Sequence, residues 1–190
     1  MKYFALPLLI CLLTFLTACG SPIEENMSRD IEEFQGTTQD GDTIQLPDDQ
    51  IGEYWVANFI FTRCDTVCPP MTSNMSRLQQ QLKDADLEIS LVSFSVDPEY
   101  DTKERLKDFA NNYNADFESW DFVTNYSFQA VKELSIKSFQ SPLSMMEDTD
   151  QVAHGTSFFL VNPKGEVIKR YDGTKASEME NIANDLKEAQ

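Results

Sequence analysis

Two cysteines separated by three residues, Cys64 and Cys68, stand where a long apolar run passes into a predicted helix. Open α/β sheets place their sites at the carboxyl ends of strands, so this position suits chemistry. Pro69 fits the first helical position and disfavours helical geometry at the residue before it, which predicts Cys68 as the N-cap and Cys64 in the preceding loop. The positive helix end would then favour thiolate over thiol at both sulfurs.

A permanent structural disulfide is the plainest alternative for this cysteine pair. It would close a loop with only three residues between the cysteines, and so short a loop removes little entropy from the unfolded chain. The spacing therefore favours a pair that cycles between dithiol and disulfide or holds one soft metal ion.

His154 is the only histidine of the chain and directly precedes an apolar strand predicted at Ser157–Val161. A single histidine is ordinarily a surface or hydrogen-bonded residue without further function. Whether it joins the cysteines depends on the fold.

Strands and helices alternate along the chain, which indicates a crossover sheet with an antiparallel edge. An N-terminal hairpin turning at Asp40-Gly41 and five further strands are predicted over Phe34–Thr38, Thr43–Leu46, Tyr54–Thr62, Leu87–Val96, Trp120–Val123, Ser157–Val161 and Glu166–Tyr171. Helices are predicted from Pro69 to Asp84 and over Asp101–Tyr113, Phe128–Phe139 and Glu178–Ala189. This order is that of an α/β fold with a thioredoxin-like mixed sheet flanked by helices, extended by the N-terminal β-hairpin.

In thioredoxin-like folds the loop before the penultimate strand lies against the cysteine loop. The topology therefore predicts that His154 meets Cys64 and Cys68 in space. Two thiolates and one imidazole form a soft set of three ligands that suits copper, with zinc as a competitor.

The N-terminus has the pattern of a targeting segment. After Lys2 comes an apolar stretch of about 14 residues, shorter than the ~20 that a membrane span needs and typical of a signal peptide. Leu16-Thr17-Ala18-Cys19 resembles the bacterial lipobox, in which the cysteine is lipidated. We therefore expect a lipoprotein signal peptide over 1–18, a tether over 19–33 and the folded domain over 34–190. An uncleaved anchor or an ordinary secretory signal is the alternative.

Lipidation at Cys19 would place the domain at the outer face of the bacterial cytoplasmic membrane, where thiols and disulfides interconvert.

The chain has 190 residues, which favours one domain, and 15 Lys and Arg stand against 32 Asp and Glu. The resulting net charge of −17 repels phosphate backbones and excludes a general nucleic-acid binder.

Further residues invite a functional interpretation. Asp97 and Asp101 form an Asp-Pro-x-x-Asp segment near the end of the second long strand and could tune the site or contact a partner, although capping of the next helix is the plainer explanation. Met71 and Met75 could offer thioethers to copper, as could Met145-Met146 before His154. Core packing for the first pair and loop or partner contact for the second are the plainer expectations.

The motifs together resemble the Sco/SenC family, in that family's order and spacing from about Phe34 to Gly173. The resemblance rests on Asn58-Phe59-Ile60-Phe61-Thr62, Cys64-x-x-x-Cys68-Pro69, Ser95-Val96-Asp97-Pro98 with Asp101, and His154 before Ser157-Phe158-Phe159-Leu160-Val161. It implies a membrane-tethered, thioredoxin-fold protein that binds copper, as Cu(I) or Cu(II), through Cys64, Cys68 and His154. Gly155-Thr156 departs from the commoner family residues, which affects loop detail alone.

The resemblance also implies the biological role. Family members help to assemble the CuA centre of cytochrome c oxidase subunit II, so the expected partners are that CuA domain, a thiol reductant and the membrane. The protein would be an assembly factor rather than an enzyme, with accessory reduction of the partner's cysteines.

Three rival functions use the same cysteines: a thiol–disulfide oxidoreductase, a redox sensor and a peroxiredoxin-like peroxidase. Thioredoxin-type enzymes usually carry Cys-x-x-Cys and a proline before the penultimate strand, and this sequence has neither in place. A peroxidase needs Pro-x-x-x-Thr-x-x-Cys, whereas Thr62 stands two residues before Cys64 without the proline. Metal binding is therefore favoured over general disulfide exchange.

Overall fold

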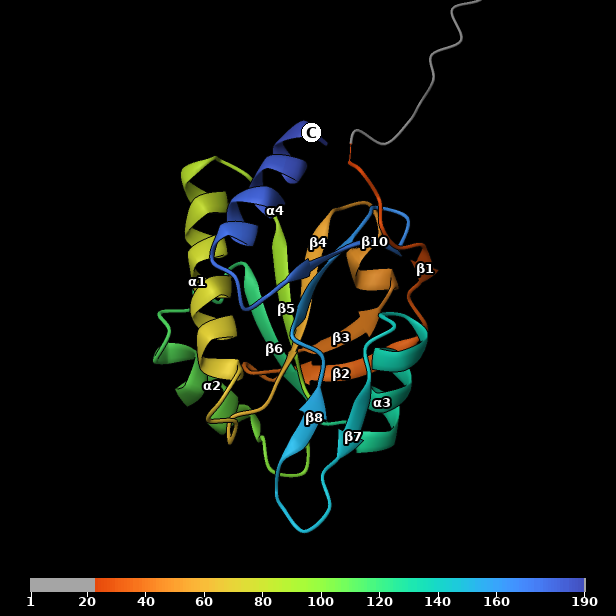
Figure 1. Cartoon of the computed structure of the whole chain (residues 1–190), viewed down its shortest axis with the longest axis vertical. Helices are drawn as coiled ribbons and strands as arrows, with labels where there is room; N and C mark the ends of the chain where they lie inside the picture. The colour runs from red at the N-terminus through yellow and green to blue at the C-terminus, as the bar shows by residue number, and fades with distance from the viewer. Residues whose placement is uncertain (1–22, 190) are drawn as a thin grey trace, which may run out of the picture.

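The computed structural model describes residues 23–189, which form a mixed eight-stranded sheet with helices on both faces (Figure 1). The predicted signal peptide and Cys19 lie outside the described residues. From one edge to the other, the strands are β1 (Arg29–Asp30), β10 (Glu166–Asp172), β9 (Ser157–Val161), β4 (Trp55–Ile60), β5 (Ser90–Ser95), β6 (Trp120–Thr124), β2 (Phe34–Thr38) and β3 (Thr43–Leu46). A short 3₁₀ turn, Asp48–Gln50, follows β3.

The centre of the sheet is parallel and its flanks are antiparallel. Strands β4, β5 and β6 run parallel, connected by helices α1 (Cys68–Asp84) and α2 (Lys103–Asn111). On the two sides, β9 and β2 pair antiparallel with β4 and β6. The α/β fold and the N-terminal hairpin of β2 and β3 are thereby confirmed.

The central strands are buried on both faces, as their nearly continuous apolar sequences require. Helices α1 and α4 (Ser177–Glu188) lie side by side, whereas α3 (Phe128–Lys137) lies on the opposite side of the sheet (Figure 1). Met71 and Met75 of α1 are fully buried, which confirms their role in core packing.

An aromatic cluster fills the face beneath α3. The ring of Phe139, which follows α3, lies 5.3 Å from that of Phe59 and 5.0 Å from that of Phe159, measured between centroids. These rings contribute apolar area and edge-to-face contacts together. They hold β4 and β9 firmly, so the segments that leave these strands start from fixed positions.

A two-stranded sheet of β7 (Leu143–Met145) and β8 (Val152–His154) projects beside the main one and appears at the bottom of Figure 1. The sequence pattern did not predict this small sheet, because each strand has only three residues and two of the three in β7 are exposed. Its register pairs Leu143 with His154. The histidine is therefore held on a strand.

The described part of the segment predicted as a tether, residues 23–33, is attached to the domain through three buried side chains and one short strand. Ile23, Met27 and Ile31 are buried, and β1 pairs with β10. The N–H groups of Asn26 and Met27 both donate to the carbonyl oxygen of Ile168, at 3.0 Å. The prediction of a tether over the whole of 19–33 was wrong because three isolated apolar residues make no continuous apolar run, yet suffice to cover the edge of an existing sheet.

Substitution Ile31→Ala is expected to lower the free energy of unfolding by about 2–5 kcal/mol, because it removes most of a buried side chain and leaves a cavity. Urea unfolding followed by tryptophan fluorescence measures the change. The exposed neighbour Glu33 supplies the control, since Glu33→Ala is expected to change stability by less than about 0.5 kcal/mol. Equal stability of the two variants would show that this segment is a tether after all.

Candidate metal centre

The loop between β4 and α1 is held in place by a buried carboxylate. Asp101 is fully buried and accepts hydrogen bonds from the Thr62 N–H (3.2 Å), the Thr62 hydroxyl (2.5 Å) and the Ser95 hydroxyl (2.6 Å). Burial raises the pKa of the Asp101 carboxyl, while the hydrogen bonds from Ser95 and Thr62 oppose the rise. The segments at the ends of β4 and β5 are thus joined two residues before the first cysteine.

The expectation that Asp97 or Asp101 caps the next helix was wrong. Thr102 is the N-cap of α2, and its hydroxyl accepts from the Arg105 N–H at 3.3 Å. Asp97 instead accepts from the Arg63 guanidinium, with its Oδ2 at 2.9 Å from Nε and 2.5 Å from Nη2. Both aspartates therefore support the cysteine loop rather than the helix.

Arg63 connects three loops and was not singled out from the sequence. Besides Asp97, its guanidinium contacts Asp150 in the turn between β7 and β8 (3.0 Å) and lies 4.1 Å from the centroid of the Tyr100 ring. The sequence signal was a cation directly before Cys64 in a strongly acidic chain. The residue links the cysteine loop to the turn that precedes His154.

The first turn of α1 surrounds the Cys64 sulfur. The helix begins at Cys68, with Val67 as the N-cap, so the prediction of Cys68 as N-cap was wrong. The Cys68 N–H donates to the Cys64 Sγ at 3.4 Å. The helix end consequently acts on the two sulfurs unequally.

The two cysteines are buried, unbonded to each other and chemically distinct. A hydrogen bond from the Cys68 thiol lowers the pKa of Cys64 to about 3 despite burial, with smaller contributions from His154 and from the Cys68 backbone N–H. The neighbouring Cys64 sulfur and burial raise the pKa of the Cys68 thiol. The two shifts run in opposite directions and favour the thiolate at Cys64 and the thiol at Cys68.

His154 joins the cysteines, as the topology predicted. Its Nε2 lies 3.4 Å from the Cys68 Sγ, and the donor atoms of Cys64, Cys68 and His154 all lie within 4.8 Å of one another. The other ring nitrogen, Nδ1, donates to the carbonyl oxygen of Gly155 at 2.8 Å. This bond orients the ring with Nε2, the nitrogen that a metal ion would use, towards the sulfurs.

Gly155 is required by a close approach. A Cβ atom there would lie 2.3 Å from the hydroxyl of the buried Ser141. A larger residue would require either the Ser141 side chain or the Gly155 backbone, whose carbonyl orients the His154 ring, to shift. The departure from the commoner family residue thus has a packing reason.

A pocket of about 510 Å³ opens onto this site. Cys64 and His154 line it, Phe61 forms one wall with its ring edge-on to the imidazole, and Met146 lies at its margin. Cys68 is fully buried behind these residues. Two sulfurs and a directed imidazole nitrogen form a donor set that fits a soft, thiophilic ion.

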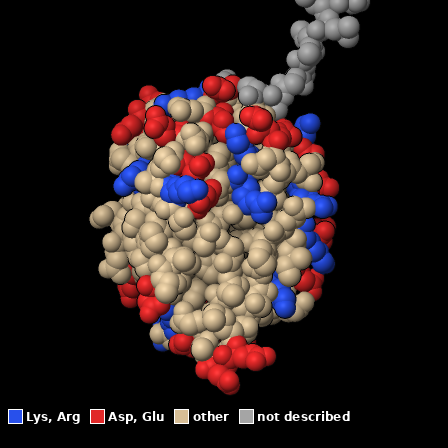
Figure 2. All heavy atoms as spheres, viewed as in Figure 1, with Lys and Arg blue, Asp and Glu red and all other residues tan. Residues whose placement is uncertain are grey.

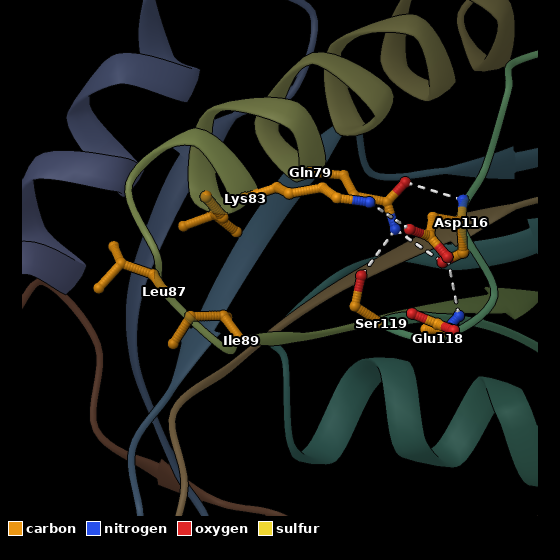
Figure 3. Close-up of a pocket in the computed structure, with 8 residues that line it drawn as sticks. Gln79, Lys83, Leu87, Ile89, Asp116, Glu118 and Ser119 are labelled. Carbon is orange, nitrogen blue, oxygen red and sulfur yellow. Dashed lines mark hydrogen bonds and ion pairs between the residues drawn. The ribbon is translucent and has the colours of Figure 1, made fainter.

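A second pocket, of about 140 Å³, lies at the other end of α1 and carries no comparable chemistry (Figure 3). Its polar groups bond one another: the Gln79 amide donates to the Asp116 carbonyl and the Ser119 hydroxyl, and Lys83 pairs with Asp116. These bonds tie α1 to the segment before β6 and leave no convergent donors.

The comparisons with known proteins agree with this geometry. The sequence pattern of the SCO1/SenC family matches residues 24–190. The chain belongs to this family. It is 43% identical to the SCO1 protein homolog of Bacillus subtilis (strain 168) over 176 residues, which cover 92% of this chain and 91% of the relative.

Solved structures extend the family likeness. A SCO1/SenC family lipoprotein from Bacillus anthracis str. Ames is 41% identical, with a TM-score of 0.81 over 87% of this chain and 99% of that one. BsSco, of the Sco family of cytochrome c oxidase assembly proteins, is 42% identical, with a TM-score of 0.80 over 88% and 96%. Sco homologues have also been solved with copper bound: Bradyrhizobium japonicum ScoI, 21% identical, shares the fold with a TM-score of 0.68 over 84% and 98%.

Unequal cysteines predict unequal reactivity. In the reduced, metal-free protein at pH 5.5, iodoacetamide is expected to modify Cys64 before Cys68, because a thiol of lowered pKa remains a thiolate as the pH falls towards that pKa. An ordinary thiol, with a pKa near 8.5, is only about 0.1% ionised at that pH. Peptide mapping by mass spectrometry identifies the modified residue. Modification of Cys68 first, or of neither residue until alkaline pH, would contradict this assignment.

Proposed function

We propose that this protein binds one copper ion through Cys64, Cys68 and His154 and assists the assembly of the CuA centre of cytochrome c oxidase subunit II. The convergence of the three donor atoms within 4.8 Å carries the proposal. Family membership supports the role, since BsSco belongs to a family of cytochrome c oxidase assembly proteins and Bradyrhizobium japonicum ScoI has been solved with copper bound.

The donor set favours copper as cargo over zinc as a structural ion. Structural zinc sites have four protein ligands in a closed tetrahedron, whereas this site has three donors beside a pocket. Thiolate and imidazole suit copper in either oxidation state. An ion held by three donors at a pocket wall can leave by ligand exchange, as delivery requires.

The same pair can act as an accessory reductant of the partner's cysteines. The Cys64 thiolate would attack a sulfur of the partner's disulfide, which forms a mixed disulfide and releases one partner thiolate. The Cys68 thiol would then give its proton to the released partner thiolate and attack the Cys64 sulfur, which releases the second partner thiolate and leaves a Cys64–Cys68 disulfide. An external dithiol reductant would restore the starting state. The distinct protonation of the two sulfurs supports this sequence.

Substitution His154→Ala separates copper binding from thiol exchange. It is expected to weaken copper binding by more than about tenfold, since even the loss of a group that only orients a ligand costs about 10- to 100-fold. The Cys64–Cys68 disulfide should still form, because it needs only the two sulfurs. Copper competition titrations and thiol counts measure the two properties in the same samples.

The oxidised wild-type protein is the matched control for this experiment. Its disulfide leaves no thiolate for the metal, so copper retention should be lost and return on reduction. If reduced wild type and His154→Ala bind copper equally, the histidine is not a ligand, and a thiol–disulfide oxidoreductase becomes the better assignment.

We further propose that a lipid on Cys19 anchors the domain at the outer face of the bacterial cytoplasmic membrane. The lipobox-like sequence before Cys19 supports this, as does the likeness to the Bacillus anthracis lipoprotein. Between residues 23 and 189, none of the helices is long and apolar enough to cross a membrane.

Substitution Cys19→Ser is expected to block processing or release the protein from membranes, because the lipid acceptor is lost. Membrane fractionation and the mass of the mature chain measure the outcome. Cys11→Ser is the matched control, since Cys11, the other N-terminal cysteine, lies in the segment predicted to be removed. A Cys19→Ser protein that is processed and retained like wild type would refute the anchor.

A further inference from the structure

The pocket beside the metal centre exposes a different donor set from the buried one. Cys64 and His154 line this pocket, and so does Met146, whereas Cys68 lies behind it with no exposed surface. An ion that enters from solvent therefore meets a thiolate, an imidazole and a thioether before it reaches the second cysteine. Three protein donors also leave a fourth coordination position free for one more ligand.

Met146 is held at the mouth of the pocket by its backbone. It follows β7, and its N–H donates to the Gln151 carbonyl at 3.0 Å, which closes the turn over 147–150. Asp150 in that turn pairs with Arg63 of the cysteine loop at 3.0 Å. The hairpin is thereby attached at its tip to the loop that carries Cys64.

The side chain of Met146 remains available for binding. It is 49% exposed, and with Met145 it supplies two of the four large apolar side chains that are exposed within residues 23–189. Single exposed apolar residues are common and need no explanation. This one lines the same pocket as Cys64 and His154, and its three flexible torsions let the sulfur move towards or away from them.

The chemistry of a thioether discriminates between the oxidation states of copper. It is a neutral, soft donor that suits Cu(I) and adds little for Cu(II), which prefers nitrogen and oxygen ligands. The acidic tip of the hairpin, red at the bottom of Figure 2, includes Glu147, Asp148 and Asp150, whose carboxylates are hard donors unsuited to Cu(I). The thioether of Met146 thus favours Cu(I), whereas the neighbouring carboxylates do not.

We propose that Met146 is an additional Cu(I) ligand at the mouth of the pocket, which makes this chain favour Cu(I) and receives the ion as it enters or leaves the Cys64, Cys68 and His154 site. This inference rests on the proposed copper-binding function. Nothing in the buried three-donor set requires Met146, so the two proposals fail separately.

The test compares Met146→Leu with Met145→Leu in the full, reduced chain in detergent. Leucine keeps the apolar volume and removes the sulfur. Met145 is the matched control, because it is adjacent and exposed but does not line the pocket. Affinities for Cu(I) and Cu(II) are measured by chelator competition, and X-ray absorption counts the sulfur atoms around bound Cu(I).

We expect Met146→Leu to weaken Cu(I) binding about tenfold, equivalent to about 1.4 kcal/mol, and to change Cu(II) binding less than twofold. The sulfur count around Cu(I) should fall by one, and Met145→Leu should match wild type. Unchanged Cu(I) affinity and sulfur count in Met146→Leu, or equal losses for both oxidation states, would overturn the inference while the three-donor site stands. A wild-type protein that binds no copper would overturn both proposals.

Discussion

The buried carboxylate of Asp101 is the constraint on which the site depends. It joins the backbone and hydroxyl of Thr62 at the exit of β4 to the hydroxyl of Ser95 at the end of β5. A carboxylate taken out of water is costly unless it is fully hydrogen-bonded, and here three donors satisfy it. The aromatic core fixes the parallel strands. The hydrogen bonds of Asp101 at the ends of these strands therefore determine where Cys64 can lie.

The position of Cys64 then determines the chemistry of both sulfurs. Hydrogen bonds from the Cys68 thiol and from its N–H stabilise the Cys64 thiolate, while Cys68 sits deeper, beside that charge and without solvent, where the thiol is favoured. A symmetric pair would either repel as two thiolates or be unreactive as two thiols. The asymmetric pair is ready both to bind a metal, with release of one proton, and to exchange with a disulfide.

A second group of contacts brings the histidine to the sulfurs. Arg63 reaches from the cysteine loop to Asp97 on one side and to Asp150 on the other, so the β7–β8 hairpin is attached to the loop it covers. The pair with Asp150 is exposed and contributes little stability by itself. Its effect is one of position, since it limits how far the turn can move from the pocket.

Several features of the fold and site followed from the sequence because they depend on local pattern. Apolar strands alternating with amphipathic helices specified the thioredoxin-like order, and the Asp40-Gly41 turn specified the hairpin. That order placed His154 beside the cysteine loop, since the carboxyl ends of parallel strands and the start of an antiparallel neighbour meet at one edge of a sheet. Burial of Met71 and Met75 followed from helical periodicity.

Other features were decided by contacts between segments distant in sequence. Ile23, Met27 and Ile31 belong to the domain only because β10 offers an edge to cover. Asp97 and Asp101 have the composition of helix caps, but Thr102 takes that role, and the aspartates turn to Arg63 and Thr62. The sequence by itself determined which residues can bind metal and the order of the elements that carry them. Tertiary structure decided which sulfur is ionised and which side chains hold the loops, because burial and hydrogen bonds exist only once the chain has folded.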